Sequence, residues 1–128
     1  MGIQYAKAMG YKVIGIDITE SALEEAKNSG ADHVFNSLAD KEYQKKITDL
    51  TGGGVHAAVN FTASKKSYDD CPAIVKAGEG IIMVVGIPRQ PLEFNALDIA
   101  LGRFRIKGSN NGSEFAYDCV LNALELTT

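Results

Sequence analysis

Asp17 is the residue whose type and position carry the clearest chemistry in this sequence. It ends a short apolar segment, Lys12 to Asp17, which follows a helical stretch beginning at Gly2. In the glycine-rich fingerprint G-x-G-x-x-G, an acidic residue about 20 positions after the first glycine accepts hydrogen bonds from the adenosine ribose of a dinucleotide. If Gly2 is the third glycine, the first lies five positions before it and Asp17 lies fifteen positions after it, which matches that spacing.

A carboxylate at this position favours NAD over NADP as the cofactor. It would bind the two ribose hydroxyls and repel a 2′-phosphate. The residues that follow, Ile18, Thr19 and Glu20, supply no cation to neutralise such a phosphate. The competing interpretation is that Asp17 only caps the helix that starts near Thr19, and the two roles are compatible.

The segment Val85-Gly86-Ile87-Pro88 ends the most apolar predicted strand and is a second candidate site. Gly86 would let a ligand approach the backbone closely. Backbone groups of Val85 and Ile87 could then bind a carboxamide, and Pro88 would shape the exit of the chain. The alternative is a simple turn from strand to loop.

Two more strand ends carry polar residues. Thr62 follows a strand and either faces the cofactor or caps the helix that begins at Ser64. Ser109 and Asn111 lie in a glycine-flanked segment after the last predicted strand, and they either contact the nicotinamide end or form a turn that caps the final helix.

Several other conspicuous residues are interpreted as structural. His33 and His56 lie at or near strand starts, on the edge opposite the predicted site. The run Gly52–Gly54 precedes a strand and not a helix, so no helix N-terminus would face an anion there. Cys71 and Cys119 lack the spacing of metal ligands and are expected to be small buried apolar residues.

Helices and strands that alternate along the chain must position these residues. The expected helices cover residues 2–9, 19–29, 41–50, 64–77, 96–101 and 114–126, with Pro72 kinking or bounding the fourth. The expected strands cover residues 12–17, 33–36, 55–61, 80–86 and 104–108. This alternation predicts parallel crossovers in an α/β, doubly wound sheet, whose ligands bind beyond the carboxyl ends of the strands.

Composition and charge exclude several classes of protein. The chain has 128 residues, 45% of them hydrophobic and 23% charged, with a net charge of −3. No basic block supports binding to nucleic acid, and the longest apolar run, Ile81 to Val85, is too short to span a membrane. No signal peptide is visible, so we expect a cytoplasmic protein without nucleic-acid or membrane partners.

The segments GIQYAKAMGYKVIGID, NSGADHVFN, VNFTAS, VVGIP and IKGS, in this order and spacing, resemble the medium-chain, zinc-dependent alcohol dehydrogenases of the tetrameric fungal and bacterial kind. The resemblance implies a Rossmann-type cofactor domain that binds NAD. It implies that Asp17 binds the ribose, that Thr62, Val85 and Ile87 border the nicotinamide, and that Ser109 and Asn111 contact the cofactor. Such enzymes oxidise a zinc-bound alcohol and pass hydride to NAD⁺, and they assemble as homo-oligomers.

The departures from that pattern are informative. Ala22 replaces the lysine that the family has five residues after the ribose aspartate, which predicts weaker cofactor binding. The cysteine and histidine ligands of the catalytic zinc and the four cysteines of the structural zinc are absent, so zinc is expected only in a catalytic domain outside this chain. We therefore expect residues 1–128 to form a single partial dinucleotide-binding domain, truncated at both ends and not catalytic by itself.

The first strand and the glycine-rich loop of the fold are also expected to be missing. Because that strand is central in the order 3-2-1-4-5-6, its neighbours would lie about 10 Å apart. We expect one of three outcomes. The half-sheets pair directly, another chain supplies the missing strand, or the chain is a fragment that retains the parent fold. Two alternatives to the alcohol dehydrogenase remain, namely a zinc-free quinone-reductase-type domain and a non-catalytic nucleotide-binding or interaction module.

Overall fold

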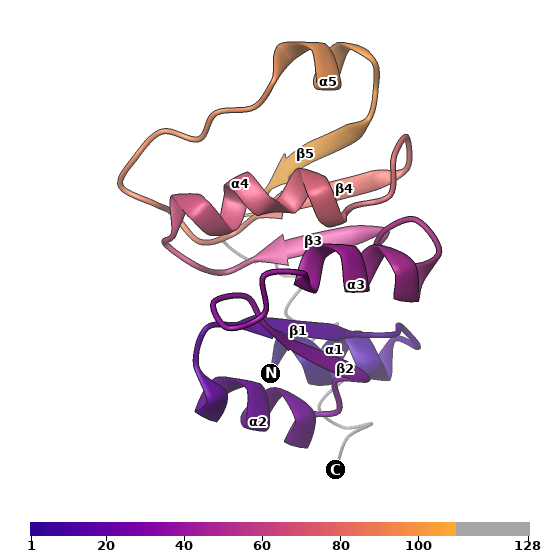
Figure 1. Ribbon diagram of the computed structural model, residues 1–128, viewed down its shortest axis with the longest axis vertical. Helices are drawn as coiled ribbons and strands as arrows, with labels where there is room; N and C mark the ends of the chain where they lie inside the picture. The colour runs from indigo at the N-terminus through magenta and orange to yellow at the C-terminus, as the bar shows by residue number, and fades with distance from the viewer. Residues whose placement is uncertain (110–128) are drawn as a thin grey trace, which may run out of the picture. The chain divides into compact units, whose positions relative to one another are not determined.

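The computed structural model describes residues 1–109, in which helices and strands alternate (Figure 1). The helices are α1 (Gly2–Ala8), α2 (Glu20–Asn28), α3 (Tyr43–Thr51), α4 (Lys65–Ile74) and α5 (Ala96–Ala100). The strands are β1 (Ile14–Asp17), β2 (His33–Asn36), β3 (Ala57–Asn60), β4 (Gly80–Val84) and β5 (Phe104–Gly108). Every element predicted within these residues is confirmed, with ends shifted by up to a few residues, and the predicted helix 114–126 lies outside them.

The described strands form two parallel sheets, one in each of two compact units. The first unit holds Met1–Tyr43 and the second begins at Gln44. Their strand orders are β1-β2 and β3-β4-β5, and all pairings are parallel, as the alternation predicted. Which of the three outcomes expected for the missing strand holds stays a prediction. The single domain over residues 1–128 stays a prediction.

In the first unit, α2 packs across both strands of its sheet (Figure 1). Gly15 in β1 makes this close approach possible, because a Cβ atom there would lie 3.1 Å from the Cβ atom of Ala26 in α2. Leu23 fills the contact and is 4% exposed. The register pairs Asp17 with Asn36, so the carboxyl ends of β1 and β2 lie at the same edge of the sheet.

In the second unit, α4 packs against its sheet around a core of buried apolar side chains. The buried residues of this core are Tyr68, Cys71, Val75, Ile82 and Phe104. The ring of Phe94, in the connection between β4 and α5, packs on the ring of Phe104 with a centroid distance of 5.9 Å. The burial predicted for Cys71 is confirmed, and Cys119 lies outside the described residues.

The ends of α4 follow from its sequence. Ser64 is its N-cap, and the Ser64 side chain accepts a hydrogen bond from the Ser67 backbone N–H. Pro72, predicted to kink or bound the helix, lies inside its last turn, and the helix continues only to Ile74. A proline there removes one backbone hydrogen bond of the helix, since its ring nitrogen carries no proton. After Ile74 the chain leaves the helix, and Val75 has an extended backbone conformation.

Candidate functional site

The Asp17 side chain closes a turn at the carboxyl end of β1. Its Oδ1 atom accepts hydrogen bonds from the Ile18 N–H at 2.7 Å, the Thr19 N–H at 2.9 Å and the Thr19 hydroxyl at 2.9 Å. Its Oδ2 atom accepts no hydrogen bond from the described part of the chain. Oδ1 therefore accepts the hydrogen bonds of the turn, and Oδ2 could accept a hydrogen bond from a ligand.

The environment of Asp17 keeps this acceptor charged. Burial is the largest single influence and raises the pKa of Asp17, but the hydrogen bonds from Thr19 and Ile18 together outweigh it. The pKa of the carboxyl group therefore lies below its ordinary value of 3.8. At neutral pH the side chain is an anion, which binds hydroxyl donors strongly and repels phosphate.

A second polar side chain, Asn36, lies at the same edge, and the sequence analysis did not single it out as a site residue. Its Nδ2 group donates to Glu20 Oε1 at 2.6 Å, and its Oδ1 atom accepts from the N–H groups of Leu38 and Ala39 at 3.0 Å. Asn36 thus anchors the start of α2 to the loop after β2. Its position at the end of a predicted strand was the signal that could have identified it.

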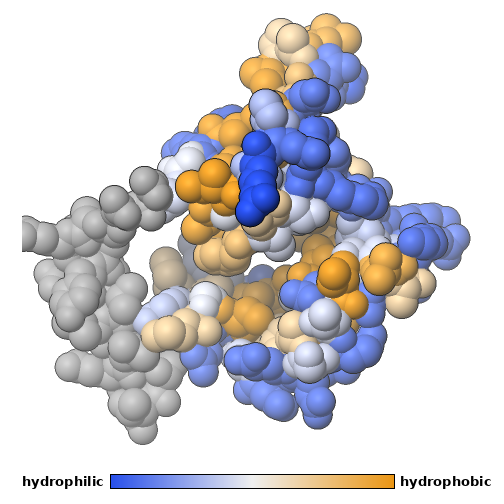
Figure 2. All heavy atoms as spheres, turned by 90° about the vertical axis from the view of Figure 1, so that its left-hand side faces the viewer, coloured by the Kyte–Doolittle hydropathy of each residue, from blue (hydrophilic) through white to orange (hydrophobic). Residues whose placement is uncertain are grey.

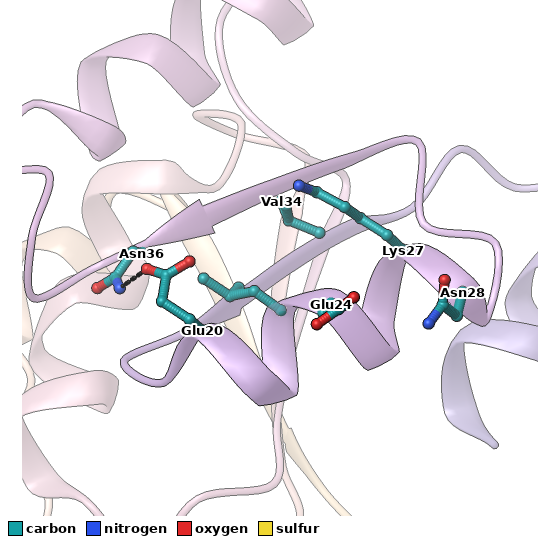
Figure 3. Close-up of a pocket in the computed structure, with 7 residues that line it drawn as sticks. Glu20, Glu24, Lys27, Asn28, Val34 and Asn36 are labelled. Atoms are coloured by element: carbon teal, nitrogen blue, oxygen red, sulfur yellow. Dashed lines mark hydrogen bonds between the residues drawn. The ribbon is translucent and has the colours of Figure 1, made fainter.

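Glu20 and Asn36 also border an open groove of about 540 Å³ between α2 and β2 (Figure 3). Leu23 and Val34 are its apolar lining residues, and the Lys27 side chain reaches from α2 toward Val34 (Figure 3). The groove is shallow and lined by surface side chains of both charge signs. Asp17 is not among the residues that line it.

In the second unit, Thr62 is bound to the chain itself. Its N–H and its hydroxyl donate to Asn60 Oδ1 at 3.0 and 2.8 Å, and its hydroxyl oxygen accepts from the Ser64 N–H at 3.2 Å. The sequence left open whether Thr62 faces a cofactor or caps α4, and the cap is Ser64. The Thr62 hydroxyl has donated its only proton, so it could meet a ligand only as an acceptor.

The segment after β4 leaves two backbone groups available. The N–H groups of Val85 and Gly86 both donate to the Asn60 carbonyl, at 3.1 and 2.9 Å, and the Gly86 carbonyl accepts from the Tyr68 hydroxyl at 2.6 Å. Within the described residues, neither the Val85 carbonyl nor the Ile87 N–H takes part in a hydrogen bond. One acceptor and one donor are the pair that a carboxamide group requires.

The structure explains why position 86 is a glycine, and the explanation differs from the one predicted from the sequence. A Cβ atom at this position would overlap the Thr62 carbonyl oxygen and would lie 2.5 Å from the Phe61 carbonyl carbon. The missing side chain is therefore needed by the chain's own backbone. Close approach of a ligand to Gly86 stays a prediction.

The remaining predicted site residues occupy simpler positions. Gly2 is exposed and is the first residue of α1, as predicted. Ser109 follows β5, and its N–H donates to the Val84 carbonyl at 2.9 Å. This bond places Ser109 at the edge where β3, β4 and β5 end. Asn111 lies outside the described residues.

Large apolar side chains are exposed beside these strand ends. Ile18 after β1 is 58% exposed, Phe61 after β3 is 66% exposed and Ile87 after β4 is 76% exposed. Figure 2 shows such hydrophobic residues at the surface, in orange, among polar ones in blue.

Residues that the sequence analysis set aside have structural positions. Gly52, Gly53 and Gly54 end α3 and form a turn with φ of +67°, +120° and +129°, which confirms the predicted turn. His33 opens β2, and His56 precedes β3 and lies 3.9 Å from Glu79. Both histidines are at the amino ends of their strands, away from the strand ends discussed above.

The described residues contain no candidate metal site and no membrane-spanning helix. Among residues 1–109, no group of three or more His, Cys, Asp or Glu side chains is arranged to hold a metal ion. The side chains present there do not fit a zinc site. No helix in that same range combines the length and apolar character needed to cross a bilayer.

Comparison with known proteins agrees with the resemblance drawn from the sequence. The chain is 38% identical over 113 residues to an alcohol dehydrogenase of Geobacillus stearothermophilus, covering 88% of this chain and 32% of that protein. It is 31% identical over 126 residues to an NAD-dependent alcohol dehydrogenase of Sulfurisphaera tokodaii, covering 98% of this chain and 36% of that protein. The chain thus spans about a third of the length of these curated relatives.

The fold has a close counterpart among solved structures. A benzyl alcohol dehydrogenase from Acinetobacter calcoaceticus matches with a TM-score of 0.83 and 32% identity, over 98% of this chain and 35% of that one. This match confirms the predicted Rossmann-type α/β class. Residues 1–126 also match the family model described as zinc-binding dehydrogenase. The chain therefore belongs to the zinc-binding dehydrogenase family.

Proposed function

We propose that this chain is the NAD-binding part of an oxidoreductase that transfers hydride between an alcohol and NAD. The observation that carries the proposal is the Asp17 carboxylate at the end of β1, with Oδ1 held by the turn and Oδ2 left to accept a ribose hydroxyl. The names of the relatives support the same activity, since they include an NAD-dependent alcohol dehydrogenase.

Each strand-end region would bind a different part of NAD. Asp17 would hold the adenosine ribose with Ile18 beside it, and Gly2 at the start of α1 would lie near the pyrophosphate. The Val85 carbonyl and the Ile87 N–H would bind the nicotinamide carboxamide, with Gly86, Thr62, Ser109 and Asn111 around it. When bound, NAD supplies the hydride acceptor, and these residues orient it.

The whole protein's chemistry lies beyond what this chain provides. The alcohol or aldehyde substrate, the homo-oligomeric assembly and the cytoplasmic location are proposals based on the family and the sequence. Because the described side chains do not fit a zinc site, we assign no metal-dependent step to them.

Calorimetric titration of the chain with NAD⁺ and with NADP⁺ tests the proposal. We expect NAD⁺ to bind more tightly, and we expect Asp17→Ala to weaken NAD⁺ binding about tenfold or more, as loss of hydrogen bonds to a charged group does. Asp49→Ala is the matched control, because it removes one exposed carboxylate from α3. It should leave the affinity for NAD⁺ unchanged.

Two outcomes would overturn the proposal. A preference for NADP⁺ would favour the zinc-free quinone-reductase-type alternative. No heat with either dinucleotide would favour a non-catalytic interaction module.

A further inference from the structure

Tyr68 in α4 joins the ends of two strands through one hydroxyl group. Its side chain is 0% exposed, and its oxygen lies 2.6 Å from the Gly86 carbonyl oxygen and 3.0 Å from the Asn60 carbonyl oxygen. The Asn60 carbonyl already accepts the N–H groups of Val85 and Gly86. A phenol has one proton to donate. The shorter distance and the free lone pairs both assign that proton to the Gly86 carbonyl.

This hydrogen bond fixes the direction of a neighbouring group, the Ile87 N–H, which takes part in no hydrogen bond within residues 1–109. The Gly86 carbonyl and the Ile87 N–H belong to one planar trans peptide, in which the two groups point in opposite directions. Because buried Tyr68 draws the carbonyl inward, the Ile87 N–H must point away from α4. Ile87 is 76% exposed, which agrees with an outward direction.

The other available backbone group is oriented in the same way. The Gly86 N–H donates inward to the Asn60 carbonyl at 2.9 Å, so the Val85 carbonyl, on the opposite side of that peptide, points outward. Two consecutive peptides are thus set by two internal bonds. The hydrogen bond to the Asn60 carbonyl is between backbone groups, and the hydrogen bond from Tyr68 depends on a side chain.

Asn60 and Ser67 hold Tyr68 in place. Asn60 is 6% exposed, and its Nδ2 group donates to the Ser67 hydroxyl oxygen at 2.7 Å, one residue before Tyr68 in α4. This bond ties the end of β3 to the helix that carries the phenol (Figure 1). Asn60, Ser67 and Tyr68 thus form a hydrogen-bonded support beneath the segment after β4.

We propose that Tyr68 is a positioning residue for the nicotinamide half of the cofactor site, because its hydroxyl orients the Gly86–Ile87 peptide so that the Ile87 N–H meets the carboxamide oxygen. The proposal rests on the proposed NAD-binding function. Burial raises the pKa of Tyr68. The phenol therefore keeps its proton, and remains a donor, at neutral pH and above.

The test compares two ligands that differ only in the nicotinamide. The chain carrying Tyr68→Phe is titrated with NAD⁺ and with ADP-ribose, which lacks the nicotinamide ring. We expect NAD⁺ to bind about fivefold to tenfold more weakly, the effect of one hydrogen bond, and ADP-ribose to change less than about twofold. An equal loss for both ligands, or no loss for NAD⁺, would overturn the proposal.

Tyr5→Phe is the matched control. The Tyr5 hydroxyl is buried and has no hydrogen-bond partner among residues 1–109, so the same atom is removed without breaking a bond seen there. This variant should bind both ligands as the unchanged chain does. A loss of NAD⁺ affinity as large as that of Tyr68→Phe would also overturn the proposal.

Amide hydrogen exchange gives a readout that needs no cofactor. In Tyr68→Phe, the Val85 and Gly86 amides should exchange about tenfold faster, because the Gly86 carbonyl has lost its donor. The amides of β1 should be unchanged. Unchanged exchange at Val85 and Gly86 would overturn the role of Tyr68. If the unchanged chain binds neither ligand, the proposed function fails, and the exchange result still decides on Tyr68.

Discussion

Replacing Gly86 with alanine tests how tightly the ends of β3 and β4 are packed. The new Cβ atom would overlap the Thr62 carbonyl oxygen and lie 2.5 and 2.6 Å from the Phe61 carbonyl carbon and oxygen. These are backbone atoms, which cannot swing aside as the end of a side chain can. Overpacking of this kind costs about 1–3 kcal/mol.

The backbone shift that relieves this overlap would disturb two hydrogen bonds of Gly86. They are the bond from its N–H to the Asn60 carbonyl at 2.9 Å and the bond from the Tyr68 hydroxyl to its carbonyl at 2.6 Å. Weakening them adds about 1 kcal/mol. We therefore expect Gly86→Ala to lower the free energy of unfolding by about 2–4 kcal/mol.

Urea unfolding followed by circular dichroism measures this loss. Gly108→Ala is the matched control: it also lies at a strand end, and its added Cβ atom would meet only the Val84 carbonyl oxygen at 4.0 Å, an ordinary contact. The control should change the stability by no more than about 0.5 kcal/mol. The steric reasoning is refuted if Gly86→Ala is no more destabilising than Gly108→Ala.

Two further substitutions test local features of the fold. Ser64→Ala removes the side-chain cap of α4 and should lower the stability by about 1 kcal/mol in the same urea assay, whereas an unchanged midpoint would mean that the cap at 3.4 Å contributes nothing. Asp32→Asn tests a pH dependence, because hydrogen bonds from the Val13 N–H and from Lys7 hold the pKa of Asp32 below 3.8. A lowered folded-state pKa stabilises the fold above pH 3.8, and this contribution disappears as the pH falls through the folded-state pKa. The variant should therefore be less stable than the original chain at pH 7, and the two should converge in acid; a difference independent of pH would contradict this assignment.

Hydrophobic pattern was enough to predict the order and type of the described elements. The segment 80–86 was recognised from its apolar run, and the glycine run 52–54 from its backbone freedom. The ends were less accurate. The predicted strand 80–86 stops at Val84. The Val85 N–H still donates to the Asn60 carbonyl, but the Gly86 N–H donates to that same carbonyl and so leaves the strand ladder. Such a bond joins residues far apart in the sequence, so no local pattern predicts it.

The candidate site was predicted less completely than the fold. Strand ends located Asp17, Thr62 and Val85, because every parallel strand delivers its last residue to one edge of its sheet. The supporting residue Tyr68 was missed, because a tyrosine in an amphipathic helix is indistinguishable from ordinary core by its spacing. Its role depends on a carbonyl 18 positions away in the chain. Contacts of that kind become visible only when the packing is known.

The sequence left two interpretations of Asp17 open, namely binding of the adenosine ribose and capping of the next helix. The structure bears on the second of them. A helix cap would bond the N–H groups of the first turn of α2, which begins at Glu20, but the partners of Oδ1 are Ile18 and Thr19, before the helix starts. The turn therefore uses Oδ1, and the proposed ribose contact would use Oδ2. Asp17→Asn keeps an oxygen that can accept the turn bonds and replaces the other oxygen with a donor.

This variant should consequently separate stability from binding. We expect Asp17→Asn to lose less stability to urea than Asp17→Ala, because its amide oxygen can still accept the turn bonds, while it loses about tenfold in affinity for NAD⁺ by calorimetry. Asp17→Ala should lose both, since it removes both oxygens. If Asp17→Asn bound NAD⁺ with full affinity, the charge of Asp17 would serve only the turn, and the ribose assignment would be wrong.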